Sequence, residues 1–166
     1  MMLLIGKRRL HQNNSFSLVE LLLVVVILGI LIGLSTPLFR KTYSNFQLAD
    51  SAKNLVSLMR FAQTSSIVER LRYRIVFDSG KSKYWLSKES DLSQPAVFSK
   101  IQGKFGRTVA IPKDINIEFA NDNITFYPDG TVDEVNIDFS NRDNKVYTVT
   151  TEGQTGYVKL LEYKAE

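Results

Sequence analysis

The side chains that most often carry out enzymatic or metal chemistry are nearly absent from this chain. It has no cysteine, and its single histidine, His11, lies in a polar stretch near the N-terminus. Thiolate zinc sites, iron–sulfur clusters, cysteine nucleophiles and a Ser-His-Asp relay are therefore excluded. We predict no catalytic residue, no metal site and no cofactor, and we do not expect an enzyme.

Carboxylates gather between residues 129 and 138, where calcium binding would be one possible chemistry. The four are Asp129, Asp133, Glu134 and Asp138. Their spacing does not match the D-x-D-x-D-G-x₅-E loop that surrounds a calcium ion with oxygen ligands. We expect Asp133 and Glu134 to cover an exposed strand end.

Three arginines alternate along a predicted strand, with Arg70, Arg72 and Arg74 on one face. A basic stripe beside aromatic residues, here Tyr84 and Trp85 in the next strand, is the pattern of single-stranded nucleic-acid binding. The alternative is a solvated outer strand face. We favour the alternative, and we do not expect nucleic acid as a partner.

Glu20 is the single charged residue between Phe16 and Phe39. As a helix, these 24 residues would extend about 36 Å, enough to cross a hydrocarbon core of about 30 Å. A buried helix of a soluble protein would need a polar face, and this segment has none. A charge deep in a membrane costs roughly 2.5–3.5 kcal/mol, so Glu20 is either a functional residue with a partner or an interfacial glutamate that reaches water.

The basic residues Lys7, Arg8 and Arg9 precede this apolar segment. They favour a cytoplasmic N-terminus, with the bulk of the chain across the membrane. A conventional secretory signal has a shorter apolar core and a small-residue cleavage site. Neither feature is present here, because the run continues to Phe39 and residues 35–41 contain no A-x-A pattern.

Helical periodicity continues beyond the apolar segment. Pro37 is expected to kink the helix without ending it, and Gly29 and Gly33 form a GxxxG that allows close helix packing in lipid. Residues 41–69 then place apolar side chains on one face of an amphipathic helix. These side chains are Leu48, Ala52, Leu55, Met59 and Ala62.

From Arg70 the apolar period changes to two, which indicates strands. The predicted strands cover 70–77, 83–88, 96–101, 108–111, 115–119, 124–127, 135–139, 146–151 and 157–163. The predicted fold class is therefore α+β: a long N-terminal membrane-spanning helix, kinked at proline, packed against a small, mainly antiparallel β-sheet head.

The N-terminal residues resemble the type IV pilin and type II secretion pseudopilin superfamily. The family motif F-(S/T)-L-(I/V)-E-(L/V)-L matches Phe16 to Leu22, after a short basic leader. Glu20 falls on the family's glutamate and Pro37 on its helix-kinking proline. Ser15 stands where the family usually has glycine.

Two segments of the head refine the resemblance. Residues 124–130, Ile-Thr-Phe-Tyr-Pro-Asp-Gly, look like the GspH/FimT family, which includes H-type minor pseudopilins and minor type IV pilins. Some FimT-like proteins that bind DNA have a glycine- and arginine-rich C-terminal motif. The matching residues 153–159 contain no arginine, which lowers the DNA-uptake interpretation.

The resemblance implies four parts: a cleaved leader (1–15), a transmembrane and fibre-core helix (16–39), an amphipathic helix (40–69) and a periplasmic head (70–166). Prepilin peptidase would cleave between Ser15 and Phe16, and Phe16 would be N-methylated. Glu20 would pair with the N-terminus of a neighbouring subunit and set the register of assembly.

The implied function is that of a minor pseudopilin in type II protein secretion. The alternative is a FimT-like minor pilin that primes type IV pili or takes part in DNA uptake. The expected partners are other major and minor pseudopilins or pilins, prepilin peptidase, the inner-membrane assembly platform and membrane lipid. The expected location is the bacterial inner membrane, single-pass, with a cytoplasmic N-terminus and a periplasmic head.

Overall fold

The computed structural model describes residues 17–91 and 97–163. The chain forms two compact units, residues 1–39 and 40–166, which are described separately. One helix, α1 (Leu18–Glu69), contributes residues to both units. The predicted leader, including Ser15 and Phe16, lies outside the described residues.

The start of α1 is capped by Ser17. Its Oγ accepts a hydrogen bond from the backbone N–H of Val19 at 3.2 Å, and its carbonyl accepts from Leu21 N at 3.1 Å. Glu20 lies in the first turn, three residues after Ser17. This is the spacing of a capping box, and an acidic side chain there also favours the positive end of the helix dipole.

The described part of the first unit is an apolar helix, and none of residues 18–34 is buried. Large apolar side chains from Leu18 to Leu34 are all exposed. Within the described part of the chain, one helix, α1, is both long enough and apolar enough to cross a membrane. Helix α1 continues through Pro37, and a kink of the helix at that proline stays a prediction.

Across residues 40–91 and 97–163, the second unit contains nine strands in two sheets, and all the pairings between these strands are antiparallel. The first sheet has the order β3-β2-β1-β6, with β4 also paired to β2, and the second has the order β5-β7-β8-β9. The bounds are β1 (Tyr73–Phe77), β2 (Lys83–Asp91), β3 (Val97–Lys100), β4 (Val109–Ala110), β5 (Ile115–Glu118), β6 (Asn123–Phe126), β7 (Asn136–Asn141), β8 (Val146–Glu152) and β9 (Tyr157–Leu161), with a 3₁₀ turn η1 (Lys104–Gly106).

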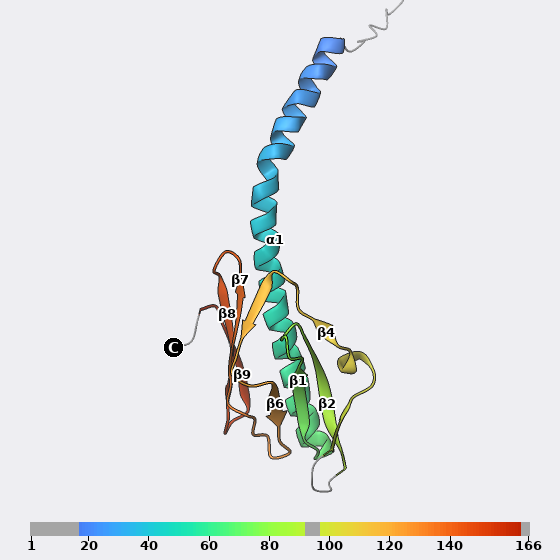
Figure 1. The fold of residues 1–166 in the computed structure, drawn as a ribbon, viewed down its shortest axis with the longest axis vertical. Helices are drawn as coiled ribbons and strands as arrows, with labels where there is room; N and C mark the ends of the chain where they lie inside the picture. The colour runs from blue at the N-terminus through green and yellow to red at the C-terminus, as the bar shows by residue number, and fades with distance from the viewer. Residues whose placement is uncertain (1–16, 92–96, 164–166) are drawn as a thin grey trace, which may run out of the picture. The chain divides into compact units, whose positions relative to one another are not determined.

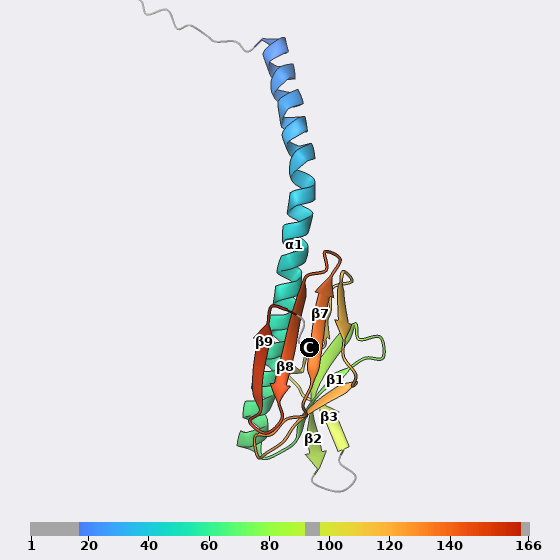
Figure 2. The same ribbon diagram turned by 90° about the vertical axis from the view of Figure 1, so that its left-hand side faces the viewer.

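Strands of both sheets lie along residues 40–69 of α1 (Figures 1 and 2). The five apolar side chains predicted to share a helix face, from Leu48 to Ala62, are fully buried. They form one hydrophobic cluster with side chains from both sheets, among them Ile75, Phe126 and Phe139. The α+β architecture with an antiparallel head is therefore confirmed.

The first strand begins later than the sequence pattern predicts. Arg70 follows the end of α1 with a φ of +56°, a left-handed conformation that terminates helices. The backbone is extended from Tyr73 only. Arg70 and Arg72 are therefore both outside the strand, which carries only Arg74 of the three arginines.

Polar contacts fix α1 to the second sheet at the β7–β8 turn. The amide of Asn141, at the end of β7, donates to Ser44 Oγ at 3.2 Å and to Asn45 Oδ1 at 2.9 Å. Its own Oδ1 accepts from the backbone N–H groups of Asp143 and Lys145. One buried side chain therefore shapes the β7–β8 turn and joins it to the helix.

Candidate functional site

Glu20 is an exposed carboxylate among exposed apolar side chains in the first unit. Within residues 17–91 and 97–163, no ion pair involves it. A charged group in such surroundings gains stability from a partner of opposite sign when the helix is removed from water. The partner that the resemblance implies is the N-terminal amine of a neighbouring subunit, at Phe16, a position outside the described residues.

The two glycines of the GxxxG leave part of this helix surface open. A Cβ added at Gly29 or Gly33 would meet nothing within 4 Å. The surface of α1 at these two glycines is thus uncovered in the described part of the first unit. Packing of another helix against these glycines remains an expectation.

The structure separates the three arginines that the sequence placed in one stripe. Arg70 lies beyond the strand, and Arg72 forms a two-point ion pair with Glu89, with Nη2–Oε1 at 2.6 Å and Nε–Oε2 at 3.0 Å. Arg74 donates to Thr125 Oγ1 at 3.3 Å, and its guanidinium lies 3.8 Å from the ring centroid of Phe98.

Glu89 is nearly buried, and Arg72 is partly exposed. The hydrogen bond from Arg72 lowers the pKa of Glu89, against the opposing effect of burial. The outer face of β1 is therefore a charge-paired surface with one arginine held over an aromatic ring. It lacks the row of three free cations that binding to phosphates would use.

The carboxylates of residues 129–138 serve the fold. Asp133 accepts hydrogen bonds from Thr125 N at 2.7 Å and from the Tyr127 hydroxyl at 3.1 Å. It therefore fastens the end of β6, and the covering of a strand end by Asp133 and Glu134 stays an expectation. Within the described residues, no group of three or more His, Cys, Asp or Glu side chains could hold a metal ion.

The two head segments that carry the family resemblance meet at Gln63 of α1. The Gln63 amide donates to the carbonyl of Gly130 at 3.4 Å. A Cβ at Gly156 would lie 2.1 Å from Gln63 Nε2 and 2.2 Å from that same carbonyl oxygen. No sequence pattern marks Gln63, because it lies on the polar side of the predicted amphipathic helix.

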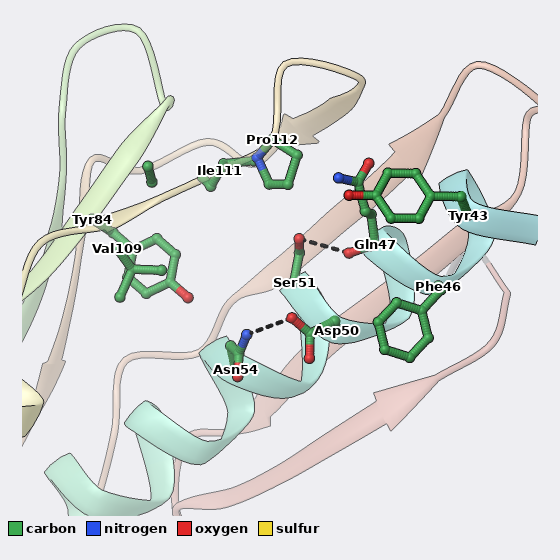
Figure 3. A pocket seen from close by; sticks show the side chains of 11 residues that line it. Tyr43, Phe46, Gln47, Asp50, Ser51, Asn54, Tyr84, Val109, Ile111 and Pro112 are labelled. Atoms are coloured by element: carbon green, nitrogen blue, oxygen red, sulfur yellow. Dashed lines mark hydrogen bonds between the residues drawn. The ribbon is translucent and has the colours of Figure 1, made fainter. Parts of the chain in front are cut away.

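A pocket of about 240 Å³ lies beside α1, between the helix and the β2–β4 edge of the first sheet (Figure 3). Most of its polar lining comes from α1, and Tyr84 of β2 and the β4 segment form the other wall. The lining residues are Tyr43, Phe46, Gln47, Asp50, Ser51, Asn54, Tyr84, Val109, Ala110, Ile111 and Pro112. No sequence motif marks this pocket, because its walls come from segments far apart in the chain.

No curated protein sequence matches this chain significantly. The prokaryotic N-terminal methylation motif matches residues 10–36. This span covers the end of the basic leader, Phe16 and Glu20.

Solved structures with a similar fold are pilin-like proteins. The minor pseudopilin EpsH of the type 2 secretion system of Vibrio cholerae superposes with a TM-score of 0.59 at 13% identity, covering 70% of this chain and 97% of EpsH. A second EpsH structure gives 0.59 at 12% identity, covering 72% and 96%.

The type IV minor pilin FimU of Pseudomonas aeruginosa strain PAO1 gives a TM-score of 0.54 at 13% identity, covering 70% of this chain and 90% of FimU. The chain therefore combines a prokaryotic N-terminal methylation motif with a pilin-like fold. In this pilin-like protein, the methylation motif covers Glu20 and the described pocket belongs to the head.

Proposed function

We propose that this pilin-like protein is a minor pseudopilin of the type II secretion system, a structural subunit of the periplasmic pseudopilus. The observation that carries the proposal is Glu20, an exposed carboxylate in the first turn of an apolar helix, inside a methylation motif. Such a charge needs a counter-charge in low dielectric. The N-terminal amine of a neighbouring subunit supplies one when the helices bundle in a fibre.

Processing by prepilin peptidase belongs to this proposal. Cleavage between Ser15 and Phe16 creates a free amine four residues before Glu20, and N-methylation of Phe16 keeps that amine basic. The apolar helix anchors the chain in the bacterial inner membrane before assembly, with the leader in the cytoplasm and the head in the periplasm. Its partners are the other pseudopilins and the inner-membrane assembly platform.

The fold supports a subunit role without enzymatic activity. EpsH, the pseudopilin whose fold this chain shares over 70% of its length, is a component of a secretion machine. Among the described residues, the carboxylates of Glu89 and Asp133 are held by hydrogen bonds that stabilise the fold. The buried aromatic side chains pack in the hydrophobic core.

A second candidate function is that of a FimT-like minor pilin of type IV pili, favoured by the likeness to FimU. One experiment separates the two. A strain that lacks this chain is tested for export of folded proteins into the medium and for surface pili, with the wild-type chain restored as control. We expect export to fail and pili to persist. Loss of pili with normal export would establish the pilin role instead.

A further inference from the structure

Tyr84 presents a buried hydroxyl that no group of the described chain satisfies. The residue is 1% exposed, and its hydroxyl is the buried side-chain polar atom without a hydrogen-bond partner among the described residues. Leaving such a group unpaired costs about 1–3 kcal/mol, so an unsatisfied hydroxyl in a native fold calls for an explanation. Figure 3 shows this hydroxyl pointing from the β2 side of the pocket towards α1.

The fold holds the Tyr84 ring in this position. Tyr84 pairs with Phe77 across the β1–β2 ladder and with Val109 of β4, and the Phe77 and Tyr84 ring centroids are 5.4 Å apart. Burial, with a smaller effect of the nearby Asp50 charge, raises the pKa of Tyr84. The hydroxyl is therefore protonated at neutral pH, with an oxygen that can accept a hydrogen bond.

Asp50 supplies the one charge among the residues that line the pocket. Its Oδ2 accepts a hydrogen bond from Asn54 Nδ2 at 3.0 Å. Asp50 takes part in no ion pair among residues 17–91 and 97–163. The pocket thus combines an uncompensated negative charge with an orphaned hydroxyl oxygen, and both favour a cationic hydrogen-bond donor.

The other walls suit an aliphatic stem. Val109, Ile111 and Pro112 form one side, and the rings of Tyr43 and Phe46 stand at the helix side with 63% and 67% of their surface exposed. A lysine or arginine side chain buries its methylene stem against such groups while its charged head reaches a carboxylate. The exposed rings add a cation–π contribution.

We propose that this pocket binds a lysine or arginine side chain from a neighbouring pilin-like subunit. The cation pairs with Asp50, donates to the Tyr84 hydroxyl oxygen and lies between the two exposed aromatic rings. Exposed aromatic residues around a buried polar anchor are typical of protein–protein interfaces. The choice of a neighbouring subunit as the source of the cation rests on the proposed function. The preference of the pocket for a cationic side chain is independent of that function.

The first test uses the full-length chain in detergent micelles and n-butylammonium chloride as a probe for the lysine side chain. Binding is followed by ¹H–¹⁵N chemical shifts of the Asn54 side-chain amide and the Ile111 backbone amide. We expect saturable shifts, and at least a fivefold rise of Kd in Asp50→Asn. Asp143→Asn, an exposed aspartate of the β7–β8 turn, is the matched control and should leave Kd unchanged. Equal binding of n-butanol, or no effect of Asp50→Asn, would overturn the proposal.

Tyr84→Phe separates the hydroxyl from the stability of the fold. Removing an unpartnered buried hydroxyl should leave the Tm of the free chain unchanged or raise it, while the Kd for n-butylammonium rises at least twofold. A fall in Tm would show that the hydroxyl is already satisfied in the free chain, for example by water, and would contradict the inference.

The source of the cation is tested in cells. A photo-crosslinking amino acid at Phe46 should join this chain to a second pilin-like subunit, and mass spectrometry should locate the linked peptide. Replacing the nearest lysine or arginine of that peptide by methionine should reduce crosslinking as much as Asp50→Asn does. Crosslinking to lipid alone, or no effect of that replacement, would overturn the assignment to a subunit.

The failures of the two proposals are distinguishable. The n-butylammonium titration reads the pocket without any assembly step, so its failure leaves the secretion assay and Glu20 untouched. Normal secretion without this chain would instead overturn the proposed function while the titration result stands.

Discussion

The guanidinium of Arg72 lies 2.6 Å from the carboxylate of Glu89, one residue beyond the Tyr73–Lys88 end of the β1–β2 pairing. Two backbone hydrogen bonds reinforce this contact, from Arg72 N to Glu89 Oε2 and from Glu89 N to the Arg72 carbonyl. The pair neutralises one of the three arginines that the sequence places in a basic stripe.

Glu89→Gln should make the fold less stable and less sensitive to acid. The pKa of Glu89 is lowered in the folded chain, first of all by its hydrogen bond to Arg72. A carboxyl with a depressed pKa contributes stability that is present above its unfolded value, near 4.5, and lost as the pH falls through the folded value. We expect Glu89→Gln to lower the Tm by a few degrees at pH 7, with a difference that shrinks below about pH 4.5.

Thermal unfolding of the chain in detergent micelles, followed by circular dichroism at pH 7 and pH 3.5, measures this. Glu134→Gln, an exposed glutamate before β7, serves as the control. A Tm difference that does not change with pH would show that the pair contributes nothing through ionisation.

Binding of duplex DNA should be weak at physiological salt. Arg72 is neutralised by Glu89, and Arg74 is held against Thr125 and Phe98. We expect a Kd weaker than about 1 μM, the range of non-specific binding. Fluorescence anisotropy with labelled duplex measures it, and Arg70→Gln with Arg74→Gln leaves the Arg72–Glu89 pair intact as a comparison. Sub-micromolar binding that this double variant abolishes would support the DNA-uptake pilin.

The mature chain should begin at Phe16. Ser15 is a small residue between a basic leader and the apolar helix, and the methylation motif spans this boundary. Intact mass of the protein from cells with active prepilin peptidase should correspond to residues 16–166 plus one methyl group. A mass that includes residues 1–15 would contradict the prediction.

Glu20→Ala should leave membrane insertion intact and prevent assembly. Insertion improves when a charge costing roughly 2.5–3.5 kcal/mol at the bilayer centre is removed. Assembly fails because the neighbour's amine loses its counter-charge. Membrane fractionation and export of folded proteins measure the two effects, with Glu134→Ala as a matched control in the head. Normal export by Glu20→Ala would show that the carboxylate has no role in assembly.

Gly156→Ala should destabilise the head by about 2–4 kcal/mol. Gly156 has a φ of +65°, and a Cβ there would meet the Gly130 carbonyl oxygen at 2.2 Å as well as the Gln63 amide. The amide can move, but the backbone carbonyl belongs to a turn closed by the Gly130 N–H to Tyr127 carbonyl hydrogen bond. Urea unfolding of the chain in micelles should reveal the loss. Gly80→Ala is the control, because its nearest neighbour atom is 4.0 Å away.

The periodic features of this protein could be predicted from the sequence. The apolar run around Glu20, the helix face from Leu48 to Ala62 and the positions of the strands are all local patterns. A helix or strand places side chains at intervals of 3.6 or 2 residues whatever it packs against. The start of β1 was placed three residues too early, because alternation continued through Arg70 while the backbone there turns to end α1.

The contacts between distant segments were decided by the tertiary structure. Pairing of β1 with β6 and the meeting of Gly130 with Gly156 at Gln63 join residues separated by tens of positions, and no local period encodes such partners. The candidate sites divide in the same way. The sequence alone indicates Glu20, because a single charge in an apolar run is costly wherever the helix packs. In the sequence, Tyr84 is an ordinary aromatic residue of a strand; the fold places its hydroxyl in the same pocket as Asp50, with no hydrogen-bond partner among the described residues.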